Sequence, residues 1–224
     1  MRRIQNLMEQ WLFIGPDNRQ EQVNLPHTWN AKDGQDGGND YYRGTCHYEK
    51  TFEKPEFDPE TEEVYLEFLG VNASSDVTVN GKELAHHDGG YSTFRINITE
   101  VLEDRNKLEV TVDNSVNGKV YPQKADFTFY GGIYRDVRFL IVSKEHFDLD
   151  YLGSNGIKIT PEVKENEANV HIETFTNTEE AQVNVQIKDQ DGKVVAEGNG
   201  CDVNLNIQNP IRWHGRKNPY LYTA

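Results

Sequence analysis

The chain has 224 residues, of which 27% are charged, and a formal net charge of -14 at pH 7. This acidic balance argues against nucleic acid and anionic membranes as partners, because both require a basic surface on the protein. Hydrophobic residues make up 36% of the chain and include 11 Tyr, 10 Phe and 3 Trp, which is enough bulky material for a folded core. No apolar run approaches the roughly 20 residues of a membrane span.

The N-terminus and the cysteines bear on the cellular compartment. Residues 1–7 contain two arginines directly after Met1 but lack an apolar stretch, so they do not have the pattern of a signal peptide. We therefore expect a cytoplasmic protein, or a periplasmic or secreted one if a leader was removed. Cys46 and Cys201 are far apart in the sequence, and we expect buried free thiols rather than a disulfide.

Short alternating segments separated by turn residues predict an all-β chain. In the first part, strand patterns occur at residues 46–52, 64–69, 75–79, 91–98 and 107–112. The first of these alternates with period two and places Cys46, Tyr48 and Phe52 on one face. Asn80-Gly81 predicts a two-residue hairpin turn, and Thr99 is a candidate cap for a single helical turn.

A second series of strands begins after residues 142–148, where aromatic residues become fewer. Its strand patterns occur at residues 157–159, 169–175, 182–188 and 203–207. Residues 189–193 have the composition of a hairpin turn. This spacing predicts a small immunoglobulin-like sandwich.

Residues 126–137 form the most informative motif of the chain. An aspartate, Asp126, stands at its head, a Gly-Gly pair at its centre and Arg135-Asp136 near its end. Residues 25–30 (LPHTWN) and 41–44 (YYRG) precede it. In this order, the three segments resemble the N-terminal sugar-binding domain of family 2 glycoside hydrolases, the β-galactosidase and β-glucuronidase group.

The resemblance implies a jelly-roll, galactose-binding-like β-sandwich over residues 1–143, followed by an immunoglobulin-like β-sandwich over residues 144–224. Residues 213–224 resemble the opening of that second domain's last hairpin, so we expect the domain to be truncated before its final strand. In the family, a (β/α)8 barrel follows and carries both catalytic glutamates. We therefore assign no catalytic residue and expect the chain to be inactive alone.

The implied parent enzyme is a retaining glycosidase that cleaves terminal β-D-galactosides. The alternatives are a β-glucuronidase and, from another class, a stand-alone carbohydrate-binding module. The implied partner is a carbohydrate; a homo-oligomer is left open, and neither a cofactor nor a metal is expected.

Three residues are candidate sugar contacts. Asp126 aligns with a family aspartate that reaches into the active site, and a carboxylate can accept charge-assisted bonds from two neighbouring hydroxyls. The alternative role for Asp126 is to cap a turn. The family also places an asparagine or aspartate from the loop around residues 36–42 near the sugar, and both Asn39 and Asp40 fit this position.

Two further patterns have competing interpretations. His86-His87-Asp88 contains metal-ligand types, but neighbours on an extended chain point to opposite faces, which favours a solvated loop without a metal. Several aromatic residues could form a surface on which sugars stack, although packing in a core is the commoner role: Tyr41, Tyr42, Tyr91, Phe127, Phe129, Tyr130 and Tyr134.

Overall fold

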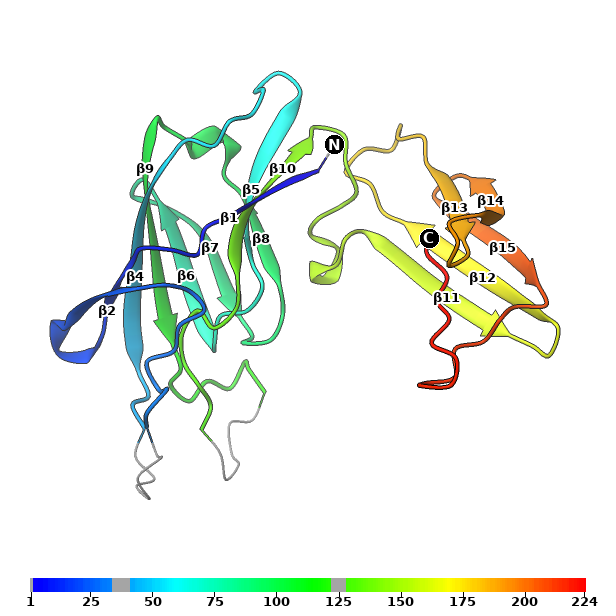
Figure 1. Ribbon diagram of the computed structural model, residues 1–224. Helices are drawn as coiled ribbons and strands as arrows, with labels where there is room; N and C mark the ends of the chain where they lie inside the picture. Colours follow the sequence, from blue (N-terminus) through cyan, green and yellow to red (C-terminus); the bar gives the residue numbers. More distant parts are fainter. Residues whose placement is uncertain (1, 34–40, 122–127) are drawn as a thin grey trace. The chain divides into compact units, whose positions relative to one another are not determined.

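The computed structural model describes residues 2–33, 41–121 and 128–224 (Figure 1). The chain divides into two compact units, Met1–Lys144 and Glu145–Ala224. Both units are built from β-strands, as the sequence predicts. In the described residues, helical structure is limited to three-residue 3-10 turns, and none is long and apolar enough to cross a membrane.

The described residues of unit 1 form two antiparallel sheets. The smaller has the strand order β1-β10-β5-β8, and the larger has the order β3-β2-β4-β9-β6-β7. The strands are β1 (Arg3–Asn6), β2 (Trp11–Ile14), β3 (Gln20–Val23), β4 (Thr45–Glu53), β5 (Glu62–Phe68), β6 (Ser74–Val79), β7 (Lys82–Asp88), β8 (Phe94–Asn97), β9 (Arg105–Asp113) and β10 (Val137–Ser143).

The core of unit 1 is formed by the alternating inward residues of its strands. On β4, Cys46, Tyr48 and Phe52 are buried while their neighbours are more exposed, so the predicted alternation is confirmed. These side chains join one cluster with residues of both sheets, including Phe139 of β10. Burying a large apolar side chain contributes roughly 1.5–3 kcal/mol, so this cluster is the main source of stability for the sandwich.

The predicted hairpin turn at Asn80-Gly81 is confirmed between β6 and β7. Both residues have positive φ, 51° and 77°, as a type I′ turn requires. The predicted role of Thr99 is wrong. Thr99 lies inside the 3-10 turn η2 (Thr99–Val101), which has no side-chain cap, and its hydroxyl bonds with Asn97 and Val64 instead.

Unit 2 is a smaller β-structure. A three-stranded sheet contains β11 (Ile157–Val163), β12 (Glu167–Thr174) and β15 (Asp202–Gln208), and a two-stranded sheet contains β13 (Asn184–Lys188) and β14 (Val194–Asn199). Apolar residues of the two sheets form a second core cluster, which includes Ile172, Ile187 and Leu205.

The cysteines are free, as predicted. Cys46 is buried on β4, and desolvation raises the pKa of its thiol to about 12. The expected burial of Cys201 is wrong, because this residue lies in the exposed turn between β14 and β15.

Candidate functional site

The three predicted sugar contacts lie outside the described residues. Asn39 and Asp40 fall in the gap at 34–40, and Asp126 falls in the gap at 122–127. The structure describes the segments that lead into and out of both gaps, and these segments lie at the same end of unit 1 (Figure 1). The residues that fix these segments therefore form the described part of the candidate site.

The buried side-chain amide of Asn30 connects the segment next to the first gap with the segment next to the second. Its Oδ1 accepts hydrogen bonds from the backbone N–H of Gly131 at 2.7 Å and from Asn114 Nδ2 at 3.3 Å. Its Nδ2 donates to Asp33 Oδ2 at 2.8 Å and to the carbonyl of Tyr42 at 2.9 Å. Asp33 and Tyr42 flank the first gap and Gly131 follows the second, so one side chain ties the two segments together.

The Gly131-Gly132 pair allows close packing against residues 25–30. A Cβ at Gly131 would lie 2.2 Å from Trp29 Cζ2, and a Cβ at Gly132 would lie 2.6 Å from the carbonyl oxygen of His27. Gly132 also has a φ of 126°, a conformation that side chains rarely adopt. Two of the sequence motifs that carry the family resemblance therefore meet directly in the fold.

A histidine and a tyrosine lie beneath this glycine turn. His27 Nδ1 and the Tyr48 hydroxyl are 2.7 Å apart, and a Cβ at Gly132 would also contact that hydroxyl. Burial lowers the pKa of His27 and raises the pKa of Tyr48. Both groups are therefore neutral near pH 7, and the pair supports the turn rather than supplying a charge.

A second amide, that of Asn72, fixes the other side of the turn. Its Nδ2 donates to the carbonyl of Tyr130 at 2.7 Å, and its Oδ1 accepts from the Tyr121 hydroxyl at 2.7 Å. Its backbone also pairs with Gly132 in both directions, at 3.0 and 3.1 Å. Tyr121 directly precedes the second gap, so Asn72 holds residues on both sides of that gap.

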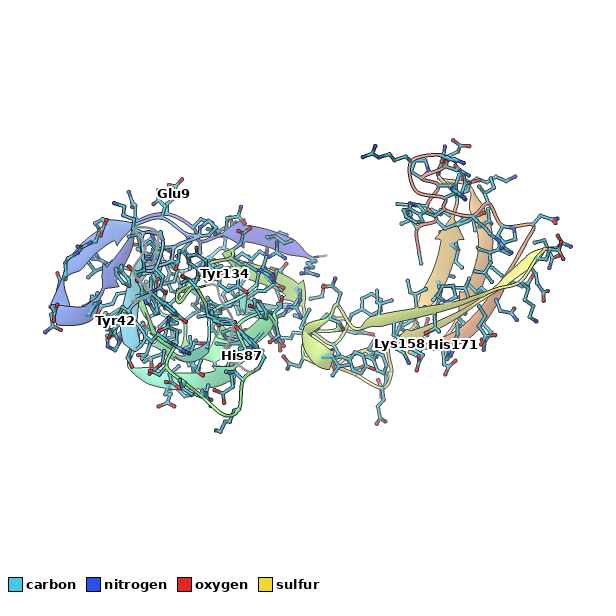
Figure 2. All side chains as sticks on the ribbon, turned by 90° about the horizontal axis from the view of Figure 1, so that it is seen from below. Glu9, Tyr42, His87, Tyr134, Lys158 and His171 are labelled. Carbon is cyan, nitrogen blue, oxygen red and sulfur yellow. The ribbon has the colours of Figure 1, made fainter. Side chains whose placement is uncertain are left out.

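Aromatic residues gather at this end of unit 1. Tyr42, Tyr91 and Tyr130 are exposed, whereas Phe129 is buried. Tyr134 is half-buried, as a packing role predicts, and its hydroxyl donates to the carbonyl of Gly90 at 2.5 Å. Figure 2 views the molecule from below and labels Tyr42 and Tyr134 in unit 1.

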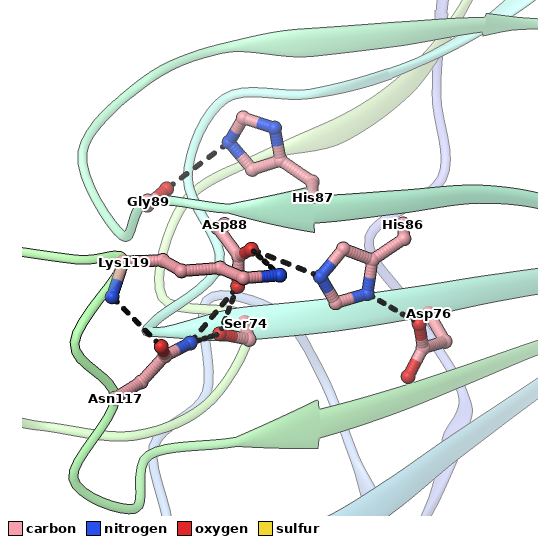
Figure 3. Close-up of polar contacts among 8 residues, drawn as sticks. All are labelled: Ser74, Asp76, His86, His87, Asp88, Gly89, Asn117 and Lys119. Atoms are coloured by element: carbon pink, nitrogen blue, oxygen red, sulfur yellow. Dashed lines mark hydrogen bonds and ion pairs between the residues drawn. The ribbon is translucent and has the colours of Figure 1, made fainter.

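The His86-His87-Asp88 segment belongs to strand β7, so the prediction of a loop is wrong. The two imidazoles do point to opposite faces, as the extended backbone predicts. His86 contacts Asp76 at 2.6 Å and Asp88 at 3.1 Å (Figure 3), while His87 stacks on Phe94 with ring centroids 4.2 Å apart. Within the described ranges, no group of three or more His, Cys, Asp or Glu residues could hold a metal ion.

Family models match both units. The glycosyl hydrolase 2 galactose-binding domain-like model matches residues 38–149, and the glycosyl hydrolases family 2 model matches residues 154–224. The chain belongs to glycosyl hydrolase family 2. The first unit is thus a galactose-binding-like sandwich and the second an immunoglobulin-like sandwich of this family.

Curated relatives and solved structures agree with this assignment. A β-glucuronidase of Bacteroides fragilis is 34% identical over 89% of this chain and 31% of its own length. A β-galactosidase of Thermoanaerobacter pseudethanolicus is 28% identical over 100% of this chain and 33% of its own. The crystal structure of an FMN-binding β-glucuronidase from Faecalibacterium prausnitzii superposes with a TM-score of 0.91, at 38% identity, over 99% of this chain and 36% of that one. The chain therefore spans about a third of the length of the relatives it matches.

The described residues of this end offer hydrogen bonding and stacking. Asn30, Asn72 and Asn114 satisfy backbone groups, and the exposed tyrosines present ring faces and hydroxyls. The three amides are buried and hold the backbone, so the exposed tyrosines are the groups that a ligand with apolar ring faces can contact. Sequence reasoning missed Asn72, Asn114 and Tyr121, because each is a single polar or aromatic residue without a local pattern.

Proposed function

We propose that this chain is the substrate-binding N-terminal part of a retaining glycosidase, and that its loops contact the terminal sugar of a β-D-glycoside. The observation that supports this proposal is that one side chain holds the segments next to both gaps. The Asn30 amide bonds to Asp33 and Tyr42 on one side and to Gly131 on the other. In the sequence, the candidate sugar contacts Asn39, Asp40 and Asp126 are adjacent to these supported segments.

The sugar is glucuronic acid or galactose. The relative with 34% identity and the structure with 38% identity are named β-glucuronidases, which supports the glucuronide. The relative named β-galactosidase is 28% identical, and a carboxylate at Asp126 suits a neutral sugar with neighbouring hydroxyls, which supports the galactoside. An enzyme assay is therefore needed to decide between the glucuronide and the galactoside.

The test uses the longer protein that contains this chain. Purified protein is incubated with nitrophenyl β-D-glucuronide and nitrophenyl β-D-galactoside, and the anomer released first is identified by NMR. We expect cleavage of one substrate with retention, and no turnover by the 224-residue chain alone. If a longer protein with a barrel domain cleaves neither substrate, the proposed reaction is wrong. If the native protein consists of these two units and binds sugars without cleaving them, it is a carbohydrate-binding module.

Asp126→Ala tests the proposed role of the aspartate in the same longer protein. Losing its hydrogen bonds in the transition state should lower kcat/KM by roughly 10² or more, if they are worth about 3 kcal/mol. The free energy of unfolding should change by no more than about 0.5 kcal/mol, as for surface substitutions. Asp104→Ala, at an exposed aspartate of unit 1, is the control and should leave both quantities unchanged. An unfolded Asp126→Ala variant, with normal activity per folded molecule, would make the residue structural.

A further inference from the structure

Two tyrosines form an exposed stack at the end of unit 1 that carries the candidate site. The ring centroids of Tyr91 and Tyr121 lie 4.6 Å apart, and the planes are inclined by 21°. Despite this contact, Tyr91 remains 56% exposed. Stacked rings that stay in contact with water leave apolar area uncovered, and such area often marks a binding surface.

Hydrogen bonds and close packing hold this stack in place. Arg135 Nη1 donates to the carbonyl of Tyr91 at 3.2 Å, and the Tyr134 hydroxyl donates to the neighbouring carbonyl of Gly90 at 2.5 Å. The Tyr134 ring also meets the Tyr91 ring edge-on, with centroids 6.5 Å apart. The backbone that carries Tyr91 is therefore fixed before any ligand arrives, which reduces the entropy lost on binding.

The second ring is fixed equally well. The Tyr121 hydroxyl donates to Asn72 Oδ1 at 2.7 Å, and the Phe129 ring is tilted by 35° to the Tyr121 ring with centroids 6.2 Å apart. A Cβ at Gly90 would lie 2.3 Å from Asn72 Oδ1 and 2.9 Å from the Tyr121 hydroxyl. The glycine at position 90 thus permits the contact between the two tyrosine-bearing segments.

The stack is close to the candidate sugar contact along the chain. Tyr121 precedes Asp126 by five residues, and five extended residues span at most about 18 Å. The stack is therefore at most about 18 Å from the candidate contact, so one extended ligand could contact both. In the described part of the chain, the Tyr91 hydroxyl has no hydrogen-bond partner, so it is available to a ligand hydroxyl.

We propose that Tyr91 and Tyr121 stack on a ring of the leaving group of the glycoside, beyond the terminal sugar. This inference rests on the proposed glycosidase function and adds a second contact for the same substrate. The chemistry recognised is a six-membered ring with an apolar face, either the C–H face of a pyranose or an aromatic aglycone. The pair favours substrates with a second ring over those with a small alkyl leaving group.

Binding to the 224-residue chain tests this inference without depending on hydrolysis. Ring signals of ¹³C-labelled tyrosines are followed by NMR during titration with methyl β-D-galactoside, phenyl β-D-galactoside, lactose and phenyl β-D-glucuronide. Ligands with a second ring should shift the Tyr91 and Tyr121 signals, and the methyl glycoside should not. The response to lactose compared with phenyl galactoside shows whether a sugar ring or an aromatic ring is preferred.

Tyr91→Ala should weaken binding of the ring-bearing ligands about three- to tenfold, the effect of losing one aromatic stacking contact. Tyr91→Phe keeps the ring and should retain most of the affinity. Trp213→Ala removes an exposed aromatic ring of unit 2 and should change nothing. Unaltered binding by Tyr91→Ala, equal shifts with the methyl glycoside, or no shift of the Tyr91 signals would each overturn the inference. Ring shifts without hydrolysis by the longer protein would instead count against the proposed reaction.

Discussion

The Asn30 amide is the most informative position for testing how the candidate site is held. Asn30→Ala removes an acceptor from the N–H of Gly131 and from Asn114 Nδ2. It also removes a donor from Asp33 and from the carbonyl of Tyr42. The Tyr42 carbonyl keeps other donors, Trp29 Nε1 at 3.3 Å and Asn114 Nδ2 at 3.4 Å, and Asp33 keeps a bond from the Tyr42 N–H. The buried N–H of Gly131 is the group that loses its partner.

The lost hydrogen bonds determine how far the free energy of unfolding should fall. Leaving one buried donor unsatisfied costs about 1–3 kcal/mol, and the space vacated by the amide adds about 1 kcal/mol. The free energy of unfolding of unit 1 should therefore fall by about 2–4 kcal/mol. For a domain of this size, the melting temperature would fall by roughly 5–15 °C.

Tryptophan fluorescence during urea unfolding measures this change. A Trp213→Phe background removes the tryptophan of unit 2, so that the signal comes from Trp11 and Trp29 of unit 1. Asn24→Ala is the matched control, since that side chain is exposed and accepts one bond from the backbone of Gln10. A loss of less than about 0.5 kcal/mol for Asn30→Ala would show that the amide does not hold the two segments together.

Two further predictions concern stability. Hydrogen bonds to Asp76 and Asp88 raise the pKa of His86, so its stabilisation is complete below its unfolded pKa of about 6.5 and is lost as the pH rises through the folded pKa. His86→Asn should therefore lower the melting temperature more at about pH 5.5 than at about pH 8.5; an equal decrease at both values would refute this. Gly132→Ala should cost at least about 2 kcal/mol in urea unfolding, because φ is 126° and a carbonyl oxygen lies 2.6 Å from the new Cβ. Gly118→Ala, with nothing within 4 Å, is its control, and equal effects would contradict the steric argument.

Local signals in the sequence predicted much of the fold. The Asn80-Gly81 turn and the alternation along residues 46–52 are properties of a few adjacent residues, and both are confirmed. Strand β1 (Arg3–Asn6) was not predicted, because all four of its residues are exposed and it has no apolar alternation. It exists through pairing with β10, which lies more than a hundred residues away in the sequence.

Long-range charge pairing was also beyond sequence reasoning. Residues 64–69 predicted a strand, but Glu67 within this run is a fully buried carboxylate. Arg95 Nε donates to it at 2.6 Å, and Arg138 donates to its other oxygen. These partners are 28 and 71 positions away along the chain, so only the assembled sheet β10-β5-β8 shows how the charge is compensated.

In the candidate site, too, the local motifs were predicted and the long-range contacts were not. The family resemblance identified residues 25–30 and 131–132 as important, but the physical reason emerges only when the Asn30 side chain meets the Gly131 backbone across 101 positions. Tyr121 was missed because a lone tyrosine next to turn residues has no periodic pattern. Its proximity to Asp126 in the sequence was the one available signal.

The amides at this end clamp the glycine turn from both sides. Asn30 Oδ1 accepts from the Gly131 N–H, and the backbone of Asn72 pairs with Gly132. A buried amide network stabilises less than apolar packing of the same volume unless every group is satisfied, but it fixes backbone position through directional bonds. The segments leading to residues 34–40 and 122–127 are therefore placed by the scaffold rather than by the residues between them. We therefore expect substitutions within those residues to leave the supporting sandwich intact, whatever they do to the proposed sugar contacts.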